Sequence, residues 1–112
     1  MKTCPTYTAD IYCGLRKEYS AHLNDVKMAR DAIQSYVNKV GLGVSFTETT
    51  FYYTDGYEPG FIVGLINYPR FPSSNDEVKK KALYLAEILM NMLEQERVSI
   101  VCSDETIMLE KS

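Results

Sequence analysis

Residues 42–66 read LGVSFTETTFYYTDGYEPGFIVGLI, two β-branched and aromatic runs separated by the turn residues 54–56. Such runs favour strands, and Asp-Gly between them favours a hairpin. Because residues 57–59 make the connection too long for a two-residue turn, the hairpin is expected to project, with residues 55–57 near its tip. The run at 60–66 is apolar at nearly every position, which predicts burial on both faces by helices or by a second subunit.

The segments before this hairpin carry two different periods. Residues 7–15 alternate between apolar and polar side chains, which predicts a half-buried strand. Residues 24–40 place apolar side chains at helical spacing, with Asn24 or Asp25 available to cap the start and Gly41 to end the helix. A strand followed by a helix is therefore expected ahead of the hairpin.

The segments after the hairpin repeat this order in reverse. Residues 67–72 hold two of the four prolines, which predicts a stiff loop. The S-x-x-E spacing at 74–77 is a capping box, and it begins a helix that is expected to run to about residue 95. Strands are predicted at 98–102 and 106–109.

The predicted order is β-α-β-β-α-β-β. This order favours an α+β fold with a largely antiparallel sheet and two helices on one face, as in the ferredoxin-like arrangement. The chain has 112 residues, 46% of them apolar, and shows no internal repeat or linker, so residues 1–112 are expected to form a single domain.

Composition and charge exclude several classes of partner. Lys and Arg total 12 and Asp and Glu total 15, giving a formal net charge of -3, which argues against a nucleic-acid polymer as partner. No apolar run approaches the roughly 20 residues of a membrane span, and the first residues show no signal-peptide pattern. A cytoplasmic protein without a membrane partner is expected.

The sequence is poor in catalytic and metal-binding groups. Cys4, Cys13 and Cys102 are an odd number of cysteines without C-x-x-C spacing, so neither a disulfide framework nor a zinc site is predicted. Cys13 and Cys102 lie in apolar strand patterns and are expected to be buried. His22 is the only histidine, and a small hydrolase that uses it is the remaining enzymatic alternative. The favoured expectation is a protein that is not an enzyme and needs no metal or cofactor.

The sequence is richer in groups that bind ligands. Nine tyrosines and four phenylalanines supply rings for stacking, and guanidinium groups are suited to phosphate. In the predicted topology, Arg16 at the end of the first strand and Arg97 at the start of the fourth share one edge with the hairpin tip. Solvated strand-end charges are the alternative interpretation of both. Tyr68 and Phe71 flank Pro69-Arg70 in the stiff loop, where ligand stacking and subunit packing are the two alternative roles of their rings. Arg70 is expected at the opposite edge, unless a second subunit contributes it to the first.

Three segments resemble a known phage family. They are IYCGLR at 11–16, GFIVGLINYPRF at 60–71 and QERVSI at 95–100. Through them the chain resembles the type-one anti-Thoeris sponges. The resemblance implies a protein in the cytoplasm of an infected bacterial host that binds a cyclic ADP-ribose-type signal, and in some members a cyclic oligonucleotide, and sequesters it without cleaving it.

The resemblance also implies an assembly and a set of binding residues. Members of the family form dimers and higher oligomers, up to hexamers, with nucleotide pockets between protomers. The two strand-edge arginines and a base-stacking aromatic ring carry over most directly, with three further polar candidates. The implied ligand-binding residues are Arg16, Arg97, Phe71, Asn67, Arg70 and Asn75. The alternative is a ferredoxin-like oligomeric structural or regulatory module with no nucleotide ligand.

Overall fold

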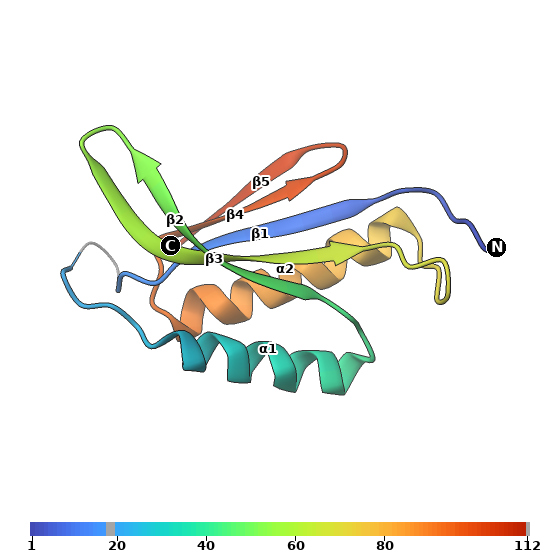
Figure 1. The fold of residues 1–112 in the computed structure, drawn as a ribbon, viewed down its shortest axis with the longest axis horizontal. Coiled ribbons are helices and arrows are strands. Elements are labelled where there is room, and N and C mark those ends of the chain that lie inside the picture. Colours follow the sequence, from blue (N-terminus) through green and yellow to red (C-terminus); the bar gives the residue numbers. More distant parts are fainter. Residues whose placement is uncertain (18–19, 112) are drawn as a thin grey trace.

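The order of elements along the chain confirms the predicted α+β fold. The computed structural model describes residues 1–17 and 20–111. In chain order the elements are β1 (Thr8–Gly14), α1 (Val26–Val40), β2 (Ser45–Tyr53), β3 (Gly56–Ile66), α2 (Asn75–Met92), β4 (Arg97–Cys102) and β5 (Thr106–Glu110). The strands form one antiparallel sheet in the order β2-β3-β1-β4-β5. Figure 1 shows both helices on one face of this sheet.

The core lies between the helices and the covered face of the sheet. Alternate residues of β1, β3 and β4 point into it, and α2 supplies the largest helical share. Cys13 and Cys102 are buried there as predicted. The largest fully buried side chains are Tyr7, Ile11, Cys13, Phe61, Val63, Leu65, Leu85, Leu89, Leu93, Val98 and Ile100.

The hairpin turn is shorter than the sequence suggested. Tyr53 pairs with Gly56, so the turn holds only Thr54 and Asp55, and Asp55 takes a left-handed conformation with φ 61°. The expectation of a long connection is wrong, because residues 56–59 continue β3 and pair with β2. The predicted projecting tip is confirmed, since the β2–β3 hairpin curls away from the rest of the sheet (Figure 1).

Within this chain β3 is buried on one face only, so the expectation that helices bury both faces is wrong. Phe61, Val63 and Leu65 are fully buried, whereas Ile62 is half-buried and Ile66 is exposed. The physical reason is that both helices cover the same face of the sheet (Figure 1). The other face, which we call the open face, is uncovered within this chain.

Local signals at the helix ends behave as expected. Asp25 caps α1 by accepting a hydrogen bond from a backbone N–H of the first turn, and Gly41 ends the helix in a left-handed conformation with φ 70°. Ser74 and Glu77 form the reciprocal capping box of α2. The two N-terminal caps fix where each helix starts and therefore how each helix lies on the sheet.

A polar network ties the start of β1 to the turn between β4 and β5. The buried Tyr7 hydroxyl donates to Asp104 Oδ1 at 2.9 Å, and Lys79 Nζ donates to Asp104 Oδ2 at 2.9 Å and also pairs with Glu105. The hydrogen bond from Lys79, and then that from Tyr7, lower the pKa of Asp104 below its usual 3.8. The network joins α2, β1 and the β4–β5 turn.

This network makes stability depend on pH in acid. Because the folded pKa of Asp104 is depressed, its contribution is present above the ordinary value of 3.8 and is lost as the pH falls through the lower folded value. We expect Asp104→Asn to flatten the loss of unfolding free energy between about pH 5 and pH 2, measured by urea denaturation. The control is Asp76→Asn in the first turn of α2. An Asp104→Asn protein that keeps the full acid slope of the wild type contradicts the assignment.

Candidate functional site

Arg16 lies just beyond β1, against the base of the projecting hairpin. It forms an isolated β-bridge with Leu23, and its Nη2 donates to the backbone oxygen of Tyr57 at 3.2 Å. Its Nε is buried and has no hydrogen-bond partner among the described residues. Since a buried unpaired donor costs about 1–3 kcal/mol, this guanidinium is ready for an anionic acceptor.

The backbone around Arg16 is fixed by two amide side chains. Asn24 Nδ2 donates to the backbone oxygens of Leu15 at 3.1 Å and Leu93 at 2.8 Å. The buried Gln95 donates through Nε2 to the backbone oxygens of Arg16 at 2.8 Å and Leu93 at 3.1 Å. The end of β1 is thereby held against the C-terminal end of α2.

A carboxylate lies over the last residue of β1. A Cβ placed on Gly14 would lie 2.6 Å from Glu58 Oε2 and 3.1 Å from Gln95 Oε1. Glycine at this position therefore leaves the space that these two polar side chains occupy. Glu58 is half-buried and follows Tyr57, whose backbone oxygen binds Arg16. An acidic and a basic side chain thus both lie at the end of β1, Glu58 over Gly14 and Arg16 on the backbone oxygen of Tyr57.

Aromatic rings cover the neighbouring part of the open face. The Phe51 ring lies over Gly60 and the Tyr53 ring over Gly56, where any side chain would collide with them. Tyr12 stacks on Phe51 with ring centroids 5.8 Å apart. This aromatic row lies next to Glu58 because Phe51 and Glu58 are cross-strand partners. It supplies flat faces of the kind that bind planar rings and cations.

A cavity of about 630 Å³ opens beside Arg16 at the hairpin. Its volume lies within the range of small-molecule sites. Its lining mixes one cation, one acid and two tyrosines, and comprises Arg16, Leu23, Tyr53, Asp55, Gly56, Tyr57 and Pro59. We define the candidate site as this cavity together with Glu58 and the aromatic row.

Arg97 lies at the same end of the sheet as Arg16. It is the first residue of β4, and the β1–β4 register pairs Tyr12 with Ser99, so Arg97 falls at the level of Gly14. Arg97 also pairs in register with Glu110 of β5. The topology therefore places the two arginines at one edge, as the sequence suggested.

The other four predicted binding residues lie at the opposite end, in the β3–α2 connection and the first turn of α2 (Figure 1). Phe71 is 72% exposed, and the Arg70 guanidinium lies 5.2 Å from the centre of its ring. Asn75 is exposed at the first position of α2. Within one chain, these side chains do not join Arg16 and Glu58.

Asn67 has a structural role at that end. It is buried, its Nδ2 donates to the backbone oxygen of Pro5 at 3.0 Å, and its Oδ1 accepts from the backbone N–H of Ser73 at 2.8 Å. Its amide thus holds the N-terminal segment and the loop before α2 together.

Sequence reasoning missed Glu58 and Gln95. The sequence pattern predicts a loop at Glu58 and a helix that reaches about Gln95, so it brings neither residue near Arg16. A usable signal was present: Gly56, Glu58 and Gly60 continue the alternation of β3 and place one carboxylate between two glycines.

The remaining candidates for catalysis by side chains are weak. Burial, and then the nearby Glu58 carboxylate, raise the pKa of the Cys13 thiol to about 12, which disfavours a nucleophilic thiolate. The His22 residue is exposed between β1 and α1. Across residues 1–17 and 20–111, no group of three or more His, Cys, Asp or Glu side chains could hold a metal ion. Neither helix in this part of the chain is long and apolar enough to cross a membrane.

Two solved structures share this fold. One is a phage SAM lyase in complex with S-methyl-5'-thioadenosine, with a TM-score of 0.77, 16% identity, and coverage of 95% of this chain and 90% of that chain. The other is a phage SAM lyase in the apo state, with a TM-score of 0.72, 17% identity and the same coverage. No protein-family model and no curated protein matches the sequence. At these identities the comparison establishes the common fold.

These neighbours correct part of the expectation drawn from the sequence. Both are phage proteins, which agrees with the phage character of the resemblance, but neither is an anti-Thoeris sponge. The expectation of a protein that is not an enzyme is wrong by this comparison, because both structures are of a lyase, which is an enzyme.

Proposed function

We propose that this chain is a phage anti-defence enzyme that cleaves S-adenosylmethionine and releases S-methyl-5'-thioadenosine. The observation that carries the proposal is that Arg16 and Glu58 both lie around the end of β1, Arg16 on the backbone oxygen of Tyr57 and Glu58 over Gly14, in a chain with the fold of the phage SAM lyase structures. The substrate carries a carboxylate, an ammonium group, a sulfonium and an adenine ring. The candidate site offers a partner for each of them.

Arg16 and Glu58 are suited to the amino-acid end of this substrate. Arg16 has a buried Nε without a partner, and a guanidinium binds a carboxylate through charge-assisted hydrogen bonds. Glu58 supplies the opposite charge for the ammonium group. Holding both charged ends restricts the conformation of the methionyl chain, which lowers the entropic cost of reaching the transition state.

The aromatic row is suited to the adenosyl and sulfonium groups. Rings such as Tyr12 and Phe51 stack on a purine and attract a cation at their faces. When the carbon–sulfur bond breaks, its electron pair stays on sulfur, and the sulfonium becomes a neutral thioether. The methionyl carbon takes its replacement bond from within the substrate. Either the substrate's own carboxylate oxygen attacks it, or an adjacent C–H bond passes its proton to solvent and its electron pair forms a C=C double bond. No water is consumed, and surroundings less polar than water favour this loss of charge.

A cyclic ADP-ribose-type molecule is the second candidate ligand. It shares adenosine with S-adenosylmethionine and adds phosphates that Arg16 and Arg97 could bind, and a cyclic oligonucleotide has the same two features. Assembly of the chain as a homo-oligomer also belongs to this proposal. It is supported by the exposed apolar side chains Tyr12, Ile66 and Met108 on the open face.

The proposal is tested by incubating the purified protein with S-adenosylmethionine and measuring S-methyl-5'-thioadenosine by mass spectrometry. We expect turnover by the wild type, and an increase in KM of about 10- to 100-fold in Arg16→Met, since a charge-assisted contact contributes about 1.5–3 kcal/mol. Arg70→Met at the opposite end of the sheet is the matched control and should retain the wild-type KM.

The same samples separate the competing ligands. Absence of S-methyl-5'-thioadenosine above the protein-free background overturns the lyase proposal. If cyclic ADP-ribose isomers then bind and are released intact on heating, the second ligand replaces the first. Native mass spectrometry of the same preparation gives the oligomeric state, and a monomer at all concentrations contradicts assembly.

A further inference from the structure

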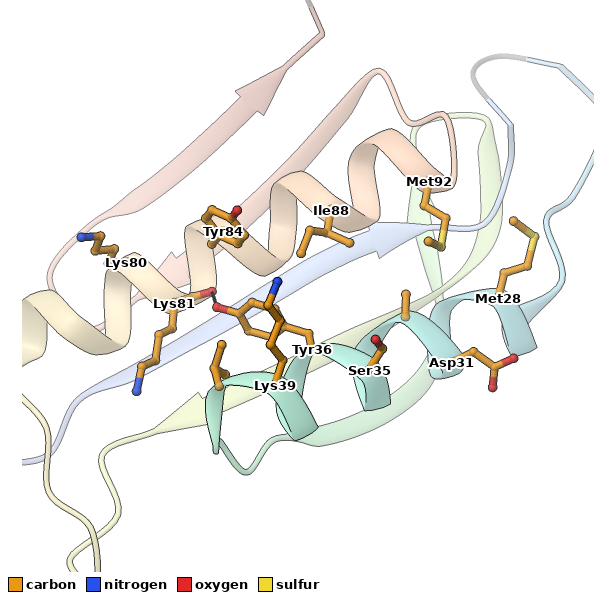
Figure 2. A pocket seen from close by; sticks show the side chains of 12 residues that line it. Met28, Asp31, Ser35, Tyr36, Lys39, Lys80, Lys81, Tyr84, Ile88 and Met92 are labelled. Atoms are coloured by element: carbon orange, nitrogen blue, oxygen red, sulfur yellow. Dashed lines mark hydrogen bonds between the residues drawn. The ribbon is translucent and has the colours of Figure 1, made fainter.

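A second cavity, unrelated to the candidate site, lies between the two helices. α1 and α2 leave a groove of about 870 Å³ on their solvent side (Figure 2). We call it the helix groove. Its lining is apolar along most of its length and includes two methionines that are more than 40% exposed, Met28 and Met92. The residues that form its apolar part are Met28, Ala32, Tyr36, Val40, Tyr84, Ile88 and Met92.

The positive charges of the helix groove gather at one end. Lys39, Lys80 and Lys81 lie at the end opposite Met28 and Met92 (Figure 2). Among the described residues, none of these lysines forms an ion pair.

The acid at the other end is already compensated. Asp31 lies there and pairs with Lys27 at 2.7 Å. A chain with a net charge of -3 therefore presents an uncompensated positive end in an otherwise apolar groove.

Two tyrosines form a platform near the lysines. The buried Tyr36 stacks on Tyr84 with centroids 6.1 Å apart, and its hydroxyl donates to the backbone oxygen of Lys81 at 3.3 Å. Tyr84 is 61% exposed. This contact holds α2 against α1 at the positive end. The three lysines therefore lie beside an aromatic surface that both helices hold in place.

We propose that the helix groove binds a single-chain amphiphile with one anionic head, the head at the lysines and the alkyl chain along the methionine end. The volume falls within the range of small-molecule sites. Met28 and Lys39 are eleven residues apart on one helix, about 16 Å, which is long enough for a medium-length alkyl chain. An acidic partner helix would instead require positive charge along the length of both rims of the groove. In this structure the positive charge lies at one end only.

The test titrates the full chain with dodecanoate below its micelle concentration, followed by NMR chemical shifts of the methionine methyl groups. We expect saturable shifts at Met28 and Met92. Acetate, which has only the head, and dodecyltrimethylammonium, which has the opposite charge, should produce none. Equal binding of the cationic amphiphile overturns the proposal, because the lysines would then contribute nothing.

Matched variants locate the site. Ser35→Trp fills the groove from α1, and Asn38→Trp places the same ring on that helix outside the groove. We expect dodecanoate affinity to fall at least about tenfold in Ser35→Trp and in Lys39→Glu/Lys80→Glu, and to stay unchanged in Asn38→Trp and in the charge control Lys2→Glu. Circular dichroism confirms that each variant is folded.

Three other outcomes overturn the proposal. The first is equal affinity in all variants. The second is lysine-dependent binding to anionic phospholipid vesicles with no binding of free dodecanoate, which would make the groove a membrane contact. The third is a ligand-free dimer that Ser35→Trp dissociates, which would make the occupant a second copy of the chain. None of these outcomes depends on lyase activity, so the test is independent of the proposed function.

Discussion

Glu58→Gln is expected to lower kcat/KM for the release of S-methyl-5'-thioadenosine by about a hundredfold, because a misplaced substrate group commonly costs that much. The substitution keeps the size of the side chain and its place over Gly14 while removing the charge proposed to hold the substrate ammonium. The methionyl chain then retains only its contact with Arg16 and samples unreactive conformations.

The matched control for this variant is Glu48→Gln. Glu48 is an exposed carboxylate of β2 that pairs with Arg30 of α1 at 2.8 Å, away from the candidate site. Removing its charge breaks one surface ion pair, which contributes about 0–1 kcal/mol to stability, and should leave turnover unchanged. If Glu58→Gln and Glu48→Gln have the same kcat/KM as the wild type, Glu58 has no part in the reaction.

Phe61→Ala is expected to lower the free energy of unfolding by about 3–5 kcal/mol. Phe61 is fully buried in β3 and stacks on Phe46 with ring centroids 5.1 Å apart. Its removal leaves a cavity on the helix-covered face of the sheet and also loses the transfer free energy of the ring. Since small domains are stable by about 5–15 kcal/mol, this one change removes a large share of the total.

The same chemical change at an exposed position provides the comparison. Phe71 is 72% exposed, so Phe71→Ala should stay within about 0.5 kcal/mol of the wild type. Urea denaturation followed by circular dichroism measures both variants. Where Phe61→Ala is too unstable for a folded baseline, Phe61→Leu provides a smaller loss in the same direction. Equal midpoints for Phe61→Ala and Phe71→Ala contradict the placement of the core.

The element order was predictable because its signals are local. Alternation in β1, the helical period of α1 and the capping box at Ser74 and Glu77 each depend on residues within a few positions of one another. The predicted length of the hairpin connection was wrong because that prediction also relied on a local signal, the proline at residue 59. Pro59 and its neighbours were interpreted as a loop, yet Pro59 lies in β3, opposite Thr50 of β2, and its backbone oxygen accepts from the N–H of Leu15.

The site was predictable only in part. Topology placed Arg16 and Arg97 at one edge, because the end of the first strand and the start of an adjacent antiparallel strand must meet there. Asn67, Arg70, Asn75 and Phe71 became candidate binding residues through the family resemblance. The structure places them at the other end of the sheet, where topology already predicted Arg70 within one chain.

Short-range patterns were thus sufficient for the α+β class, the helix caps and the buried face of β1, since periodicity and capping act over one or two turns of chain. The candidate site required the folded molecule. The hydrogen bond from Arg16 to Tyr57 joins residues 41 positions apart, and the space over Gly14 that Glu58 occupies exists only once β1 and β3 pair in one register. The helix groove likewise forms only where α1 and α2 lie side by side. Long-range register and packing decide which side chains share a site, and no pattern within a single segment contains that information.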